Sequence, residues 1–254
     1  AVEASPRNAQ MLAASIAHNR FSNVHLVQAA VSDQPGTLHF HSQGPYGHVS
    51  TPEDATAISV EAVRVDDLLS RLGWGDVAFV KLDVEGSEVA CLRGMRALLS
   101  RGDAPLLFVE SNGHMLEYFA ETPQSLKAVL EDFGLQVYLV ETDGLRPVRA
   151  SDVQGETVVD YLAVKKLPAA LASERLLPPL GVEEQLARLA TSGMSPHVPE
   201  RMHAARTLRD APEAILSHPR AQRLIEQMMA REGDDAVKSV LPKKKTRPWW
   251  RVFG

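Results

Sequence analysis

Three carboxylates follow one short apolar segment and form the clearest chemical signal in this chain. Asp83, Glu85 and Glu88 come directly after Val77–Leu82, which is apolar except at Lys81 and predicts a strand covered on both faces. Open α/β sheets bind ligands at the carboxyl ends of their strands. Capping of the helix that follows is the structural alternative for Glu85 and Glu88. Three carboxylates at one strand end favour instead a pocket for a cationic ligand.

A second group of candidate residues follows the next apolar segment. Glu110 and His114 come after Pro105–Val109, which predicts a further buried strand, so they are expected at the same edge of the sheet. Asp83, Glu110 and His114 are therefore the candidate catalytic bases. Imidazole has the ordinary pKa closest to neutrality, although a single loop histidine is more commonly just solvated.

The remaining histidines and the cysteine predict no metal site and no disulfide. His39, His41 and His48 follow no ligand spacing that is typical of a metal centre. Cys91 is the one cysteine of the chain, so an intramolecular disulfide is excluded. This composition fits a reducing compartment, and we expect a cytoplasmic protein.

The elements that must position these residues alternate between strand and helix over the first two thirds of the chain. This alternation is typical of an α/β fold with a mostly parallel sheet. The predicted helices cover residues 6–19, 66–72 (capped by Asp66), 88–100 and 122–133. The predicted strands cover residues 24–31, 37–41, 59–65, 77–82 and 105–109, with 135–141 and 157–165 as a closing antiparallel pair, and residues 43–57 are predicted to be a loop.

Frequent prolines mark a change of character after residue 167. We predict an α/β domain over residues 1–167, a helical extension over 168–237 and a basic aromatic tail over 238–254. The predicted helices of the extension cover residues 182–190, 200–208, 212–216 and 219–229.

The segment Lys81–Glu88, KLDVEGSE, closely resembles the signature of the FkbM family of methyltransferases. The segment Val63–Leu69 is similar to the family's stretch before that signature, and Pro105–Glu110 to a strand after it. Near the start, Glu3–Asn8 resembles the end of the family's second strand, with Ala4 where proline is usual. The resemblance covers residues 1–165.

This resemblance implies a Rossmann-like class I methyltransferase sheet and S-adenosylmethionine as the cofactor. It implies that Glu3 binds the ribose hydroxyls, since a carboxylate offers two acceptor oxygens to a vicinal diol. Capping of the following helix is the alternative for Glu3. The cofactor site implied by the resemblance comprises Glu3, Ser5, Ala30, Val31, Asp83 and Glu85. Simple strand packing is the alternative for Ala30.

The implied activity is O-methylation of a hydroxyl on a sugar or a secondary metabolite. Two other functions stay open: a nicotinamide-dependent Rossmann oxidoreductase, and a non-catalytic binding protein without a cofactor loop. The resemblance also implies a first strand and a glycine-rich turn before Glu3, and we expect them upstream of Ala1.

Charge and hydropathy limit the partners that we expect. The net charge is −5, which gives no general attraction to nucleic acid or anionic membranes. No apolar run approaches the ~18 residues of a membrane span, and no signal peptide is visible. Lysines beside Trp249 and Trp250 in the tail would suit a membrane surface, but a solubilising end is the simpler interpretation. We therefore expect a small-molecule or glycan acceptor, and the sequence leaves the oligomeric state open.

Overall fold

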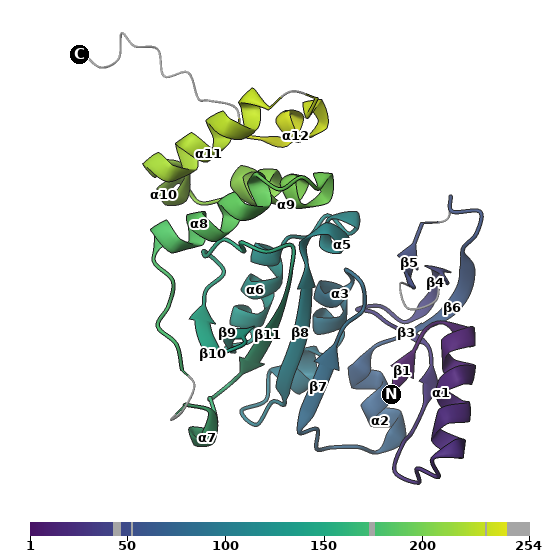
Figure 1. Cartoon of the computed structure of the whole chain (residues 1–254). Coiled ribbons are helices and arrows are strands. Elements are labelled where there is room, and N and C mark those ends of the chain that lie inside the picture. The colour runs from purple at the N-terminus through teal and green to yellow at the C-terminus, as the bar shows by residue number, and fades with distance from the viewer. Residues whose placement is uncertain (43–46, 52, 173–175, 232, 243–254) are drawn as a thin grey trace, which may run out of the picture. The chain divides into compact units, whose positions relative to one another are not determined.

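The computed structural model describes residues 1–42, 47–51, 53–172, 176–231 and 233–242 (Figure 1). The chain forms two compact units. Unit 1 comprises residues 1–150 and 158–179, and unit 2 comprises residues 151–157 with the chain from Leu180 onward. Unit 1 is mixed α/β, as the sequence predicted, and unit 2 is built of helices. The domain boundaries at residues 167 and 237 stay predictions, and the predicted tail falls mostly outside the described residues.

The larger sheet of unit 1 has five strands in the order β10-β9-β11-β8-β7. Its strands are β7 (Phe79–Leu82), β8 (Leu106–Asn112), β9 (Gln136–Glu141), β10 (Gly144–Val148) and β11 (Val158–Val164). β7 runs parallel to β8, and β11 lies antiparallel between β8 and β9. The predicted antiparallel pair of residues 135–141 and 157–165 is thus confirmed.

Helices that follow these strands cover one face of the sheet (Figure 1). They are α3 (Glu88–Arg93), α4 (Arg96–Leu99), α5 (Gly113–Tyr118) and α6 (Pro123–Asp132). Leu107 and Val109 of β8 pack with Leu92, Leu116 and Leu126 of these helices in one fully buried core. This core fixes the ends of β7 and β8, from which the candidate residues project.

The N-terminal part of unit 1 holds two smaller sheets. One pairs β1 (Val2–Glu3) with β2 (Val27–Gln28), and α1 (Pro6–His18) follows β1. The other has the order β3-β6-β4-β5. Its strands are β3 (Ala30–Val31), β4 (Gly36–His41), β5 (His48–Ser50) and β6 (Ile58–Val63), and α2 (Val65–Leu72) follows β6.

The sheets are mixed rather than mostly parallel. Among the described strands three pairings are parallel and five are antiparallel. Hairpins join antiparallel neighbours, which explains β4–β5 and β9–β10. The other antiparallel pairings are those of β4 with β6 and of β11 with β8 and β9. Within the described residues, β1 is paired along one edge, with β2, and β7 along one edge, with β8. The first strand implied by the resemblance stays a prediction.

Two predicted elements are divided in the structure. The strand over residues 24–31 is two short strands, because β2 pairs with β1 whereas β3 pairs with β6. The helix over residues 88–100 breaks at Gly94 into α3 and α4. A Cβ at Gly94 would lie 2.1 Å from the Ser32 carbonyl oxygen, so the backbone of Ser32 leaves no space for a side chain at this position.

Three other expectations are wrong in detail. The N-cap of α2 is Arg64 without a side-chain cap bond, and Asp66 instead accepts hydrogen bonds from Ala97 N and Leu98 N of α4, at 2.8 and 3.1 Å. β7 is not covered on both faces, since Phe79 is 55% exposed. The predicted loop over residues 43–57 contains β5 within its described part.

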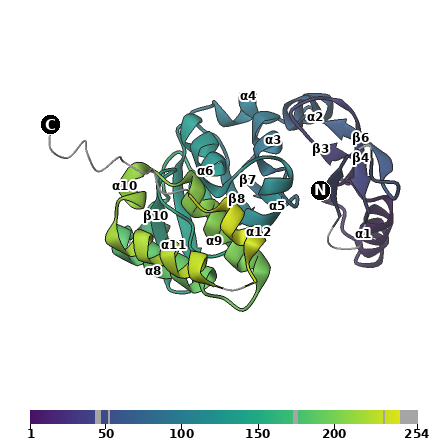
Figure 2. The ribbon, with the colours of Figure 1, turned by 90° about the horizontal axis from the view of Figure 1, so that it is seen from above.

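Unit 2 contains five helices among its described residues, and α8, α9 and α11 run beside one another in Figures 1 and 2. They are α8 (Val182–Gly193), α9 (Val198–Asp210), α10 (Glu213–Leu216), α11 (Pro219–Ala230) and α12 (Asp235–Val240). The guanidinium of Arg201 donates two hydrogen bonds of 2.6 Å to the buried Asp234 carboxylate. His203 is buried and pairs through Nε2 with the Gln154 carbonyl, and burial lowers its pKa to about 4.

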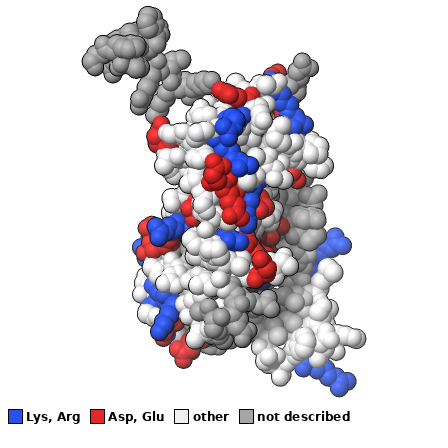
Figure 3. Space-filling view, turned by 60° about the vertical axis from the view of Figure 1, so that its left-hand side comes forward, with Lys and Arg blue, Asp and Glu red and all other residues white. Residues whose placement is uncertain are grey.

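The surface carries both signs of charge. On the face shown in Figure 3, acidic and basic side chains lie interspersed. Among the described residues, no helix combines the length and the apolar character that crossing a bilayer requires.

Candidate functional site

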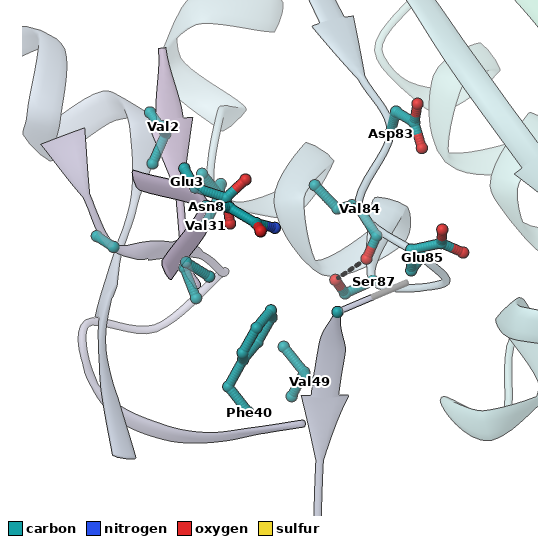
Figure 4. A pocket seen from close by; sticks show the side chains of 14 residues that line it. Val2, Glu3, Asn8, Val31, Phe40, Val49, Asp83, Val84, Glu85 and Ser87 are labelled. Atoms are coloured by element: carbon teal, nitrogen blue, oxygen red, sulfur yellow. Dashed lines mark hydrogen bonds between the residues drawn. The ribbon is translucent and has the colours of Figure 1, made fainter. Parts of the chain in front are cut away.

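A cavity of about 190 Å³ lies in unit 1 between β1, β3 and the turn after β7 (Figure 4). Apolar side chains and backbone line much of it, and its polar side chains belong to Glu3, Asn8, Asp83, Glu85 and Ser87. Figure 4 shows Glu3 and Asn8 on one side, Asp83 and Glu85 on the other, and Phe40 and Val49 between them.

The β1 side of the cavity is built around the start of α1. Glu3 ends β1, and its Oε1 accepts a hydrogen bond of 2.7 Å from Ser5 N. Ser5 is fully buried and caps α1 by accepting from Asn8 N at 3.4 Å. Its Oγ also pairs with Ser42 Oγ at 2.9 Å, and Ser5 does not line the cavity. Glu3 thus both accepts the hydrogen bond from Ser5 N and lines the cavity. Ser5 lies outside the cavity and stabilises the start of α1.

The middle of the cavity is formed by small and apolar residues. Ala29 and Ala30 are buried, and they line it together with Val31. Phe40 of β4 and Val49 of β5 face the same space from the hairpin. Small residues on one wall and an aromatic ring on another leave a slot that suits a flat group.

The turn after β7 supplies the acidic side. Asp83 accepts a hydrogen bond of 2.5 Å from Lys81 Nζ, and its side chain is 37% exposed. Glu85 has a positive φ of 52°, an uncommon conformation for a residue with a side chain. Burial, followed by the charge of Asp83, raises the pKa of Glu85 above its ordinary value. A cation entering the cavity would relieve this repulsion.

Glu88 holds this turn from inside. Its side chain is fully buried, and its Oε1 accepts from Val84 N and Gly86 N, both at 3.2 Å. Burial raises the pKa of its carboxyl group. Glu88 therefore fixes the path of the backbone through Asp83 and Glu85 and does not itself line the cavity.

Gly86 sets how closely the turn lies against α5. Its φ is +101°, and a Cβ there would lie 2.4 Å from the Met115 carbonyl oxygen. Only glycine combines this φ with such a close approach at no steric cost. The acidic turn is thus pressed onto the helix that follows β8.

Glu110 joins the acidic side from β8. It stands directly opposite Asp160 of β11, on the sheet face that also carries Lys81 and Asp83. Burial, and then the charges of Asp83, Glu85, Glu88 and Asp160, raise the pKa of Glu110 to about 7. A carboxyl group with such a pKa is present in both protonation states near neutral pH, as a general base requires.

Comparison with known protein families agrees with this geometry. Residues 1–137 match the model of the methyltransferase FkbM domain, which covers more than half of the chain. The chain belongs to the FkbM methyltransferase family. No curated protein and no solved structure matches the chain. The matched residues of this FkbM domain include every residue that lines the cavity.

The remaining sequence-predicted residue of the FkbM domain, His114, lies on α5 beside this cavity's acidic turn. Asn112 ends β8 and accepts hydrogen bonds from His114 N and Met115 N, at 3.2 and 3.3 Å, so that α5 begins there. The His114 ring meets Tyr118 edge to face at 5.5 Å. Neither His114 nor Glu110 lines the cavity itself.

The structure thus brings together most of the predicted site residues. Glu3, Ala30, Val31, Asp83 and Glu85 line one cavity of the FkbM domain. Sequence reasoning missed other residues of the site, namely Asn8, Phe40, Val49 and Asp160. Asn8 carried a signal, because it lies in the first turn of the helix predicted to start at Pro6, shortly after Glu3. The others depend on strand pairings with no local signal.

One hairpin histidine of the FkbM domain, His41, pairs with an aspartate. His41 Nδ1 pairs with Asp54 Oδ2 at 2.9 Å, and Asp54 also accepts from Ser50 Oγ and Thr56 N. These hydrogen bonds lower the pKa of Asp54. Among the described residues, no group of three or more His, Cys, Asp and Glu side chains is arranged to hold a metal ion.

Proposed function

We propose that this FkbM domain transfers a methyl group from S-adenosylmethionine to a hydroxyl oxygen, in the cavity between β1, β3 and the turn after β7. One observation carries the proposal: the carboxylates of Glu3 and Asp83, eighty residues apart in the chain, line the same cavity. The antiparallel β11 between β8 and β9 supports a Rossmann-like methyltransferase topology for the larger sheet.

The residues present fit this cofactor in both charge and shape. Asp83 and Glu85 offer negative charge to its cationic methionine end, and a bound cation would counteract the burial and the charge of Asp83 that raise the pKa of Glu85. The adenine ring suits the apolar part of the cavity beside Ala30 and Val31. Glu3 would accept hydrogen bonds from the ribose through Oε2, since Oε1 is used by Ser5 N.

Catalysis then consists mainly of alignment. When bound, S-adenosylmethionine supplies an electrophilic methyl carbon on a positively charged sulfur. Glu3 and the turn around Asp83 fix the two ends of the cofactor, so that the methyl points to one place. The acceptor oxygen bonds to the methyl carbon while the carbon–sulfur bond breaks, and the electron pair of that bond stays on sulfur.

The proton of the acceptor hydroxyl must leave in the same reaction. Glu110 is the base that the electrostatics favour, because its pKa is raised to about 7. Asp83 already accepts a hydrogen bond from Lys81 Nζ and is better suited to binding. His114 is the second candidate base, positioned by the Asn112 cap of α5.

Calorimetric titration of the whole protein with S-adenosylmethionine tests the proposal. Glu3→Gln keeps an oxygen for Ser5 N but removes the charge, so we expect binding to weaken roughly 10- to 150-fold, the range for a hydrogen bond to a charged group. Asp143→Ala, which removes an exposed carboxylate of the β9–β10 turn, is the matched control and should bind as the wild type does.

Three results would contradict the proposal. The wild-type protein binding a nicotinamide dinucleotide in preference would favour an oxidoreductase. The absence of any nucleotide binding would favour a non-catalytic protein. Equal affinity of the wild type and Glu3→Gln would remove Glu3 from the site.

A further inference from the structure

Four rings form a row that crosses from the β4–β5 hairpin to α5, here called the ring row. His41 and His48 stand opposite each other across the hairpin and stack with their centroids 5.3 Å apart. The His48 ring lies 6.3 Å from the ring of Tyr118, which in turn lies 5.5 Å from that of His114. The ring row therefore joins two segments about seventy residues apart in the chain.

The ring row borders the acidic side of the cavity. Glu85, which lines the cavity, interacts electrostatically with His48 of the ring row and with Glu110 of β8. The close contact of Gly86 with the Met115 backbone presses the same turn onto α5, which carries Tyr118 and His114. One carboxylate, that of Glu85, thus belongs to both the cavity wall and the surroundings of the ring row.

Tyr118 lies open to solvent within this row. It has ring neighbours on two sides, yet it is 69% exposed, more than any other large apolar or aromatic residue among those described. An exposed tyrosine presents a flat apolar face together with a polar hydroxyl end. Imidazole and carboxylate groups around such a face can donate to and accept from hydroxyl groups.

We infer that the ring row, with Glu85 beside it, is the acceptor subsite, and that its ligand is a sugar ring with a free hydroxyl. This inference rests on the proposed function and names its substrate class. A sugar ring has one face of C–H groups, which packs on an aromatic ring, and a rim of hydroxyls, which needs the polar groups that surround Tyr118 here. Because Tyr118 lies at the surface, there is room for the sugar to be part of a larger glycan or glycoside.

The other acceptor classes fit the ring row less well. A flat apolar metabolite needs an enclosed slot, whereas Tyr118 is open. The carboxylates of Asp83, Glu85 and Glu110 would repel the phosphates of a nucleic acid.

A sugar lying on Tyr118 would extend toward the carboxylates. A hydroxyl on its rim would then reach the border between the ring row and the cavity, where Glu85 lies. Its oxygen receives the methyl group, and its proton passes to the Glu110 carboxylate and from there to water. The ring row thus holds the acceptor, while Glu110 takes the proton.

Saturation-transfer NMR on the whole protein tests this subsite without any turnover. The probes are the methyl glycosides of glucose, galactose, mannose, rhamnose and fucose, and phenyltrimethylammonium as a cationic probe. Tyr118→Ala removes the exposed ring. Trp74→Ala is the matched control, because Trp74 is also exposed and contacts the ring of His25 rather than the ring row.

We expect saturation of the C–H protons of at least one glycoside, with affinity roughly three- to tenfold weaker in Tyr118→Ala and unchanged in Trp74→Ala. No glycoside binding, binding that ignores Tyr118→Ala, or Tyr118-dependent binding of the ammonium probe alone would each overturn the inference. Calorimetry with S-adenosylmethionine on the same samples separates the two proposals. Cofactor binding without Tyr118-dependent sugar binding defeats the subsite alone, and loss of cofactor binding defeats the methyltransferase proposal.

Discussion

The raised pKa of Glu110 gives the most direct test of the electrostatics of the site. Asp160 stands opposite Glu110 in the pairing of β8 with β11, so their carboxylates share one face of the sheet. At a charge separation of ~6 Å and an effective dielectric constant of ~40–80, their repulsion is ~0.7–1.4 kcal/mol. This energy corresponds to ~0.5–1 pKa unit. Burial and the charges of Asp83, Glu85 and Glu88 contribute more to the raised pKa than Asp160 does, so Asp160→Asn should lower the pKa of Glu110 from about 7 by about 0.5 unit, the lower end of this range.

Lys81→Met should move the same pKa in the opposite direction. Lys81 interacts favourably with the charge of Glu110, and removal of the ammonium group takes away a charge that stabilises the carboxylate. The two substitutions lie on either side of β8, on β11 and β7. Opposite shifts would show that charge, rather than a general disturbance of the sheet, sets the pKa.

NMR titration of ¹³C-carboxyl-labelled glutamate measures these shifts, with Glu110→Gln to assign the signal. The pKa of Glu110 also determines how the methyl-transfer rate changes with pH. A base acts as the carboxylate, so the methyl-transfer rate should rise with pH through about 7 in the wild type and through a lower pH in Asp160→Asn. A wild-type Glu110 that titrates at the ordinary value of a glutamate, or an Asp160→Asn variant with a higher pKa, would refute this reasoning.

Three further predictions concern stability. Gly86→Ala should lower the free energy of unfolding, measured in urea, by about 2–4 kcal/mol, because Gly86 has a positive φ and its backbone contacts that of Met115. Gly102→Ala, at a position with open space around it, should change this free energy by less than ~0.5 kcal/mol. Equal effects of the two substitutions would contradict this prediction. Asp234→Ala should lower the free energy of unfolding by about 3–5 kcal/mol, because it leaves the buried guanidinium of Arg201 without its ion-pair partner. Adding Arg201→Met should recover most of this loss. No recovery in denaturation curves would argue against a role of the ion pair. The pKa of His203 is lowered to about 4, so its neutral form contributes up to about 3 kcal/mol of stability that is present above pH ~6.5 and is lost as the pH falls through 4. Melting curves of His203→Gln should lack this pH dependence. An identical loss of stability in the variant would exclude His203 as its source.

The sequence predicted the α/β class and the position of the acidic turn because both depend on local patterns. The apolar run before Asp83 and the order of strands and helices are visible in a single pass along the chain. The antiparallel pairing of β11 with β9 was also predicted, from two apolar segments near the end of the α/β region. In each case the neighbouring residues carry the information.

The errors arose where distant contacts decide the local structure. The helix over residues 88–100 breaks at Gly94 because the Ser32 backbone lies against it, and nothing near Gly94 in the sequence shows this. Asp66 has the residue type of a helix cap, but it reaches α4 instead. Burial and neighbouring carboxylates raise the pKa of Glu110, and the contribution of Asp160 depends on the register of β8 and β11, which local patterns do not specify.

The buried thiol of Cys91 links the cavity to the core of the sheet. Cys91 lies on α3, is fully buried, and donates a hydrogen bond of 3.3 Å to the carbonyl oxygen of Val31, which lines the cavity. Burial raises the pKa of this thiol, so it reacts poorly while β3 stays packed on α3. Since the chain has one cysteine, the rate at which a thiol reagent labels the protein depends on how often β3 separates from α3. The reactivity of this native cysteine thus reports local opening of the cavity wall without an engineered label.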